Sequence, residues 1–200
     1  MPPEHVLTKY TALITSVITL FFLQKMRTVT KILSNSFLLH GQKVFIQNRE
    51  STMIFLKSIM KTLSVIGSTG SIGVQTLEVA AERGYRVAGL AAGKSADALE
   101  QQILAVRPRV AALYDETAGK ALAEKLKGVC DTEILWGESG VCAVASLPEC
   151  DLVVNAAVGI SGLKPTVAAV GAGKTLALAN KESLVCAGDI VNRLAKEKGV

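Results

Sequence analysis

Short apolar runs alternate with amphipathic stretches from residue 60 onward. The apolar runs are rich in aliphatic and β-branched residues and predict strands at 63–66, 85–92, 109–113, 132–136, 151–156 and 175–179. Helical periodicity between them predicts helices at 72–83, 96–106, 116–127, 138–145 and 165–170, and a last amphipathic helix that opens at 180–182. Since apolar strands that alternate with helices are typical of a parallel sheet covered on both faces, the pattern predicts an α/β domain with a doubly wound parallel sheet.

Residues with known preferences for helix ends mark several of these boundaries. Gly84 follows the first helix as a C-cap, and Pro108 stops the second helix. The side chains of Ser95 and Asp115 are expected to cap the N-termini of the second and third helices, because hydroxyl and carboxylate oxygens accept hydrogen bonds from first-turn amides.

A glycine turn joins the first strand to the first helix. Gly67, Gly70 and Gly73 follow the strand at a spacing of three, with two serines and a threonine among them. Glycine permits positive φ and close approach of a phosphate to the backbone, and the free amides of a helix N-terminus favour an anion. The spacing is GxxGxxG rather than GxGxxG, so the match to a dinucleotide fingerprint depends on the strand, turn and helix context as much as on the letters. The turn therefore predicts a pyrophosphate site in a Rossmann-like doubly wound parallel sheet.

The end of the second strand favours NADP over NAD. An NAD-specific protein usually presents an Asp or Glu there to the adenine ribose, whereas this chain has Ala91, Ala92, Gly93, Lys94 and Ser95. A cation and a hydroxyl suit a 2′-phosphate. The alternative is that Lys94 is only a solvated residue at a helix start, as exposed lysines commonly are.

Polar residues also follow the fifth and sixth strands, at the edge of the sheet where ligands bind. Asn155 and a loop with two glycines come after the fifth strand. Asn180, Lys181 and Glu182 follow the sixth strand directly and begin a helix. Lys181 could neutralise a phosphate or polarise a carbonyl, with the amide and the carboxylate ordering the lysine and the cofactor. Equally, the three residues could form a simple helix start, in which asparagine caps and glutamate complements the dipole.

Residues 1–59 differ in composition from the rest of the chain. Residues 1–62 have a net charge of +6 and the remainder has −1, so the basic pI of about 9.1 belongs to this leader and indicates no nucleic-acid surface on the domain. The uncharged apolar run 11–23 is shorter than the ~20 residues that span a bilayer, and polar residues follow it where a signal peptide needs small ones. We expect 1–59 to be a leader outside the folded domain, with Met53 or Met60 as the true start, or a plastid-type transit peptide. We expect 60–200 to be the domain.

Several other chemistries lack the residues that they need. A P-loop requires glycine where this chain has Ala88 and Ala168, and neither tyrosine of the domain has the lysine four residues on that a short-chain reductase requires. Both histidines precede residue 41, which excludes a Cys-His acyl mechanism in the domain. The cysteines lack metal-ligand spacing, which indicates reduced, mostly buried thiols in a cytoplasmic protein: Cys130, Cys142, Cys150 and Cys186.

Three motifs, GSTGSIG at 67–73, AAGKS at 91–95 and ALANKESLV at 177–185, resemble the NADPH-binding half of the 1-deoxy-D-xylulose 5-phosphate reductoisomerase family in order and spacing. The resemblance covers about 60–200. It implies an enzyme that rearranges and reduces 1-deoxy-D-xylulose 5-phosphate to 2-C-methyl-D-erythritol 4-phosphate in the non-mevalonate isoprenoid pathway. It implies that Lys181 reaches the substrate. Ser95 departs from the family pattern, since many members have Asn at this position. The residues that it implies for NADPH are Thr69, Gly70, Ser71, Ile72, Gly93, Lys94, Ser95, Asn180 and Glu182.

The same resemblance implies a divalent Mg or Mn ion, a phosphosugar substrate and a homodimer for the full-length enzyme, with no nucleic-acid or membrane partner. In the family the metal ligands come after the last helix of this chain, so we expect no metal ligand and no catalytic residue before Val200. The expectation is a fragment that binds NADPH and is inactive alone. The alternative is a non-catalytic NADP-binding module, and the genomic sequence beyond codon 200 would separate the two.

Overall fold

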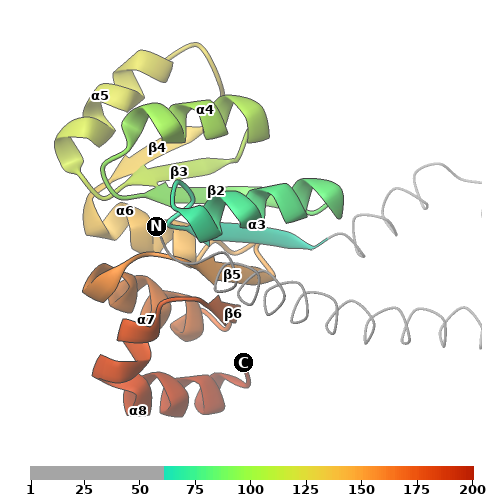
Figure 1. Cartoon of the computed structure of the whole chain (residues 1–200), viewed down its shortest axis with the longest axis vertical. Coiled ribbons are helices and arrows are strands. Elements are labelled where there is room, and N and C mark those ends of the chain that lie inside the picture. The colour runs from blue at the N-terminus through green and yellow to red at the C-terminus, as the bar shows by residue number, and fades with distance from the viewer. Residues whose placement is uncertain (1–60) are drawn as a thin grey trace, which may run out of the picture. The chain divides into compact units, whose positions relative to one another are not determined.

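Within residues 61–200, six parallel strands form a single sheet in the order β4-β3-β2-β1-β5-β6 (Figure 1). The computed structural model describes residues 61–200, so the predictions about 1–59 and about Met60 lie outside the described residues. The strands are β1 (Thr62–Ile66), β2 (Arg86–Ala92), β3 (Val110–Leu113), β4 (Glu133–Trp136), β5 (Leu152–Asn155) and β6 (Thr175–Leu178). The helices are α3 (Ser71–Glu82), α4 (Ala96–Val106), α5 (Glu116–Leu126), α6 (Gly137–Ala145), the 3-10 helix η1 (Gly159–Gly162), α7 (Leu163–Gly171) and α8 (Lys181–Lys198).

The strand order reverses beside β1. The chain proceeds outward from β1 to β4 and then returns to place β5 on the other side of β1, so the topological switch point lies between β1 and β5. Ile66, at the end of β1, is in register with Ala91 of β2 and Asn155 of β5, which brings the carboxyl ends of these three strands together. The predicted doubly wound parallel sheet is confirmed, and its ligand crevice is expected at this edge.

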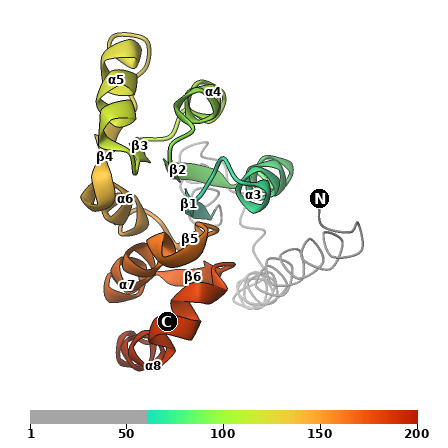
Figure 2. The same cartoon turned by 60° about the vertical axis from the view of Figure 1, so that its left-hand side comes forward.

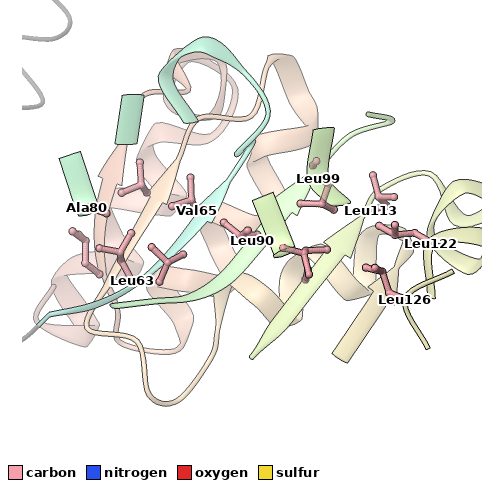
Figure 3. Packing of buried hydrophobic residues seen from close by; sticks show 14 residues of the cluster. Leu63, Val65, Ala80, Leu90, Leu99, Leu113, Leu122 and Leu126 are labelled. Atoms are coloured by element: carbon pink, nitrogen blue, oxygen red, sulfur yellow. The ribbon is translucent and has the colours of Figure 1, made fainter. Parts of the chain in front are cut away.

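Two apolar cores cover the two faces of the sheet. Figure 2 shows α3 and α4 on one side of the strands and α6 and α7 on the other. Alternate residues of β1 divide between the cores, since Leu63 and Val65 pack with α3, α4 and α5, whereas Ile66 packs with α6 and α7. Figure 3 shows the first core, which includes Leu99 of α4, Leu113 of β3 and Leu122 of α5.

Element boundaries agree with the predicted ones to within two residues, and two features were not predicted. The 3-10 helix η1 lies in the loop after β5. Helix α8 has a kink at Ala187, whose φ of −145° is not helical. None of the helices within residues 61–200 is long and apolar enough to cross a membrane.

The predicted caps are confirmed at Asp115 and Gly84 and wrong at Ser95. Asp115 Oδ1 accepts a hydrogen bond from the Ala118 amide at 2.9 Å, and Gly84 follows α3 with a φ of +66°. Ser95 stands at the N-cap of α4, but its side chain makes no capping bond. An inverse γ-turn explains this, because Ser95 has φ −78° and ψ 75° and the Ala96 amide donates to the Lys94 carbonyl at 2.9 Å. This backbone departs from the extended conformation that a side-chain cap uses.

Candidate functional site

The turn after β1 is held between β2 and β5. The amides of Gly67 and Ser68 both donate to the carbonyl oxygen of Ala91, at 2.8 and 2.9 Å. Gly67 has a φ of +78°, and a Cβ there would lie 2.6 Å from the carbonyl carbon and oxygen of Ala156 after β5. Only glycine fits this position, both in conformation and in space.

The start of α3 leaves its first amides free for a ligand. Gly70 is the N-cap residue and offers no capping side chain. The first-turn amides of a helix, which include those of Ser71 and Ile72, have no carbonyl partner within the helix. A Cβ on Gly73 would lie 2.2 Å from the Gly67 carbonyl oxygen, so glycine at 73 lets the helix begin close against the turn. This arrangement suits a phosphate group.

A cavity of about 650 Å³ opens at the carboxyl ends of the strands, beside this turn. Its lining includes five of the residues predicted to bind the cofactor, namely Thr69, Gly70, Gly93, Lys94 and Ser95. Its volume lies within the range of small-molecule sites, about 300–1,000 Å³. The cavity extends from the ends of β2 and β3 across β1 to the loop after β5. An elongated ligand such as a dinucleotide fits this course.

The cavity contains the lysine that follows β2, whose role toward a 2′-phosphate stays a prediction. Lys94 is exposed and makes no ion pair within residues 61–200. The cavity also contains a carboxylate, since Asp115 lines it after β3. One oxygen of that carboxylate already accepts a bond from the Ala118 amide, which ties it to the start of α5. A 2′-phosphate near Lys94 therefore has a cation available that no neighbouring acid occupies.

Several cavity residues were not predicted as ligand contacts. Tyr114 follows β3 directly, with 42% of its surface exposed, and its amide donates to the Ala92 carbonyl at 2.9 Å. Val158 and Ser161 line the cavity from the loop after β5. The rule that ligands bind beyond the carboxyl ends of strands points to these segments, but it does not identify which side chains face the ligand.

Asn155 holds the loop after β5. It is fully buried, and its Nδ2 donates to the Gly162 carbonyl at 2.8 Å and to Thr166 Oγ1 at 2.9 Å. Its Oδ1 accepts from the Ala157 amide at 3.1 Å. With both ends of the amide in use, this side chain shapes one wall of the cavity from behind.

Asn180 supports the same loop from the start of α8. Its Nδ2 donates to the carbonyl oxygens of Ala157 and Gly159, each at 2.7 Å, and its Oδ1 accepts from the amide and the hydroxyl of Ser183. The side chain is 2% exposed, and the hydrogen-bonding capacity of its amide is used within the protein. The helix-cap interpretation is confirmed, whereas the cofactor contact of Asn180 stays a prediction.

The other predicted contacts lie outside the lining of the cavity. Ser71 and Ile72 sit in the first turn of α3, next to the cavity residue Gly70. Lys181 is exposed and Glu182 is half-buried in the first turn of α8, and neither makes an ion pair within the described chain. The structure therefore brings the predicted contact residues 69–70 and 93–95 together in the cavity lining, whereas Asn180 hydrogen-bonds to the loop that follows β5.

The cysteines are free thiols, but the prediction that most are buried is wrong. Cys150 is buried, Cys130 and Cys142 are half-buried, and Cys186 is exposed. Burial raises the pKa of Cys150, which lies 3.0 Å from Ser64 Oγ. No group of three or more His, Cys, Asp or Glu within residues 61–200 could hold a metal ion.

Relatives of known identity share this region. The family model of 1-deoxy-D-xylulose 5-phosphate reductoisomerase matches residues 63–188. The enzyme of that name from Desulfosudis oleivorans is 48% identical over 143 residues, which cover 70% of this chain and 37% of that protein. The chloroplastic enzyme of Mentha piperita is 48% identical over 143 residues, which cover 70% of this chain and 30% of that protein. The chain thus spans about a third of the length of these relatives.

Solved structures have the same fold. A crystal structure of DOX-P reductoisomerase in complex with NADPH, fosmidomycin and magnesium is 38% identical, with a TM-score of 0.67 over 70% of this chain and 35% of that chain. The reductoisomerase from Zymomonas mobilis in complex with NADPH is 34% identical, with a TM-score of 0.66 over 70% of this chain and 37% of that chain. The family match covers the glycine turn, the cavity and the start of α8. On this evidence, the chain belongs to the 1-deoxy-D-xylulose 5-phosphate reductoisomerase family.

Proposed function

We propose that this chain supplies the NADPH-binding part of a 1-deoxy-D-xylulose 5-phosphate reductoisomerase, which rearranges and reduces its substrate to 2-C-methyl-D-erythritol 4-phosphate. One observation carries the proposal. The glycine turn at the start of α3 and the acid-free end of β2 line the same cavity at the switch point of the sheet. Backbone amides for a pyrophosphate and a cation for a 2′-phosphate are thus available to one ligand.

Different residues of this cavity bind different parts of NADPH. Thr69, Gly70 and the first-turn amides of α3 bind the pyrophosphate, because they offer donors and the positive end of the helix dipole. Lys94 and Ser95 bind the 2′-phosphate, and Tyr114, which also lines the cavity, offers its ring to the adenine. NADPH, when bound, supplies the hydride for the reduction. The residues of this chain hold NADPH so that its nicotinamide ring lies toward the loop after β5.

Two further parts of the reaction are proposed by analogy with the family. Lys181 reaches the phosphosugar substrate from the start of α8, where it is exposed and carries no ion pair within the described residues. The divalent ion, which is magnesium in the related complex with NADPH and fosmidomycin, is assigned to the part of the relatives that this chain does not span.

The assembly and location follow the same analogy. We propose a homodimer for the complete enzyme and a cytoplasmic location. A plastid location applies instead if residues 1–59 act as a transit peptide. The relative from Mentha piperita is named as a chloroplastic enzyme, which supports this alternative.

Titration of the 200-residue chain with NADPH and with NADH tests the cofactor assignment. Nicotinamide fluorescence reports binding of both, and NADPH is expected to bind at least about tenfold more tightly, since a charge-assisted bond to a phosphate contributes on this scale. Equal affinity, or tighter NADH binding, would contradict the proposal.

The genomic sequence beyond codon 200 tests the enzyme assignment separately. An in-frame continuation that includes an Asp-x-Glu metal motif supports the reductoisomerase, because paired carboxylates are suitable ligands for Mg²⁺ or Mn²⁺. A verified stop codon supports instead the non-catalytic NADP-binding module.

A further inference from the structure

Gln102 reaches from the middle of α4 to the glycine turn, 34 residues earlier in the chain. Its Nε2 donates a hydrogen bond to the carbonyl oxygen of Ser68 at 2.8 Å. Ser68 is fully buried, and its own amide donates to Ala91. The residue that precedes the cavity-lining Thr69 is therefore held on its carbonyl side by α4 and on its amide side by β2.

The orientation of this carbonyl determines the direction of the next amide. The peptide bonds within residues 61–200 are trans, and in a trans peptide the carbonyl oxygen and the following N–H point in opposite directions. Because the Ser68 oxygen is turned toward Gln102, the Thr69 N–H is turned away from it. A turn that binds a phosphate depends on such backbone donors being fixed in advance.

We propose that Gln102 is a positioning residue for the cofactor, which orients the Ser68–Thr69 peptide so that the Thr69 amide donates to the pyrophosphate. The proposal rests on the NADPH site proposed above. It also links two parts of that site, because α4 begins directly after Lys94 and Ser95 and carries Gln102 in its next turns. Gln102 makes no contact with the reacting atoms in this proposal.

Two polar atoms beside the bond argue against a role in packing alone. Gln102 Oε1 and Ser68 Oγ are buried and have no hydrogen-bond partner within residues 61–200. Unpaired buried polar groups destabilise a fold, and an apolar side chain at 102 would avoid one of them. A glutamine at this position is therefore better explained by the bond that it gives to the turn than by the stability of α4.

The test replaces the donor and keeps the length of the side chain. Gln102→Met removes the amide, and Gln102→Glu replaces the donor with an acceptor that faces the Ser68 carbonyl. Gln101→Met is the matched control, because Gln101 is the exposed neighbour on the same helix. Dissociation constants of the 200-residue chain are measured by calorimetry for NADPH and for 2′-AMP, which lacks the pyrophosphate, and circular dichroism verifies folding.

The expected result is selective. Gln102→Met weakens NADPH binding about fivefold to tenfold, as for the loss of one hydrogen bond, and leaves 2′-AMP binding unchanged. Gln102→Glu weakens NADPH binding further, and Gln101→Met changes neither constant. Unchanged NADPH binding in both Gln102 variants, or an equal loss for NADPH and 2′-AMP, overturns the positioning role. If the unsubstituted chain binds 2′-AMP and NADPH with equal affinity, the proposed pyrophosphate site itself fails.

Discussion

The side-chain amide of Asn180 donates to the carbonyl oxygen of Ala157 at 2.7 Å, across 23 residues of sequence. This bond joins the start of α8 to the loop that forms one wall of the cavity, and the second Nδ2 bond to Gly159 extends the same contact. The first turn of α8 and the cavity wall are therefore one hydrogen-bonded unit.

Substitution of this asparagine is expected to destabilise the domain. Asn180→Ala removes the cap of α8 and leaves the carbonyls of Ala157 and Gly159 without their donor. We expect the free energy of unfolding, measured by urea denaturation, to fall by about 2–3 kcal/mol. Asn192→Ala, at an exposed position of the same helix, should change it by less than about 0.5 kcal/mol. Equal effects of the two changes would show that the Asn180 network contributes little.

Lys94→Ala should reduce the preference for NADPH. Loss of the cation removes its attraction for a 2′-phosphate, so NADPH affinity falls about tenfold while NADH affinity is retained. Lys127→Ala removes an exposed lysine at the end of α5, outside the cavity, and should affect neither ligand. A parallel loss of NADH binding would indicate that Lys94 supports the fold of the site instead of recognising the phosphate.

Gly73→Ala should disrupt the start of α3. The added Cβ would lie 2.2 Å from the Gly67 carbonyl oxygen and 2.6 Å from the Ser68 backbone, so the helix and the turn must separate. The expected cost is about 1–3 kcal/mol by thermal or urea unfolding, together with weaker NADPH binding. Gly171→Ala is a suitable control, since nothing lies within 4 Å of a Cβ there, and it should be neutral or slightly stabilising. A folded Gly73→Ala variant with native affinity would contradict the close packing of helix on turn.

Acid should weaken the pair formed by Arg109 and Glu149, outside the cavity. The hydrogen bond from the Arg109 guanidinium lowers the pKa of the Glu149 carboxyl below its ordinary value. A lowered folded pKa means that the pair stabilises the domain above the pKa of the unfolded carboxyl, and that this contribution disappears as the pH falls through the folded pKa. Glu149→Gln should therefore lower Tm slightly at about pH 7. The difference in Tm between the variant and the unsubstituted chain should shrink toward about pH 3. Glu124→Gln, in an exposed pair on α5, is the control and should change Tm at about pH 7 very little.

Local signals were sufficient for the fold and for the glycine turn and the end of β2, which line the cavity. The glycine turn is visible in the sequence because Gly67 needs a positive φ, and the missing acid near Lys94 is visible because it lies within a few residues of a predicted strand. Other contacts depend on segments far apart in the chain. Gln101 and Gln102 are equivalent in sequence, and only the structure shows that the second of them reaches Ser68. Likewise, a capping asparagine has the same sequence pattern whether it faces solvent or, as at Asn180, a buried loop.

The carbonyl of Ala91 receives both amides of the glycine turn, while Gly93 only two residues later has nothing within 4 Å of its missing Cβ. The backbone of the turn is thus fixed by Ala91, whereas the nearby position 93 has open space for a side chain. In the proposed NADPH site, the side chains at 93–95 determine the nucleotide preference, whereas backbone amides of the turn bind the pyrophosphate. On this proposal, we expect substitutions within 93–95 to shift the coenzyme preference while the turn keeps its hydrogen bonds to Ala91.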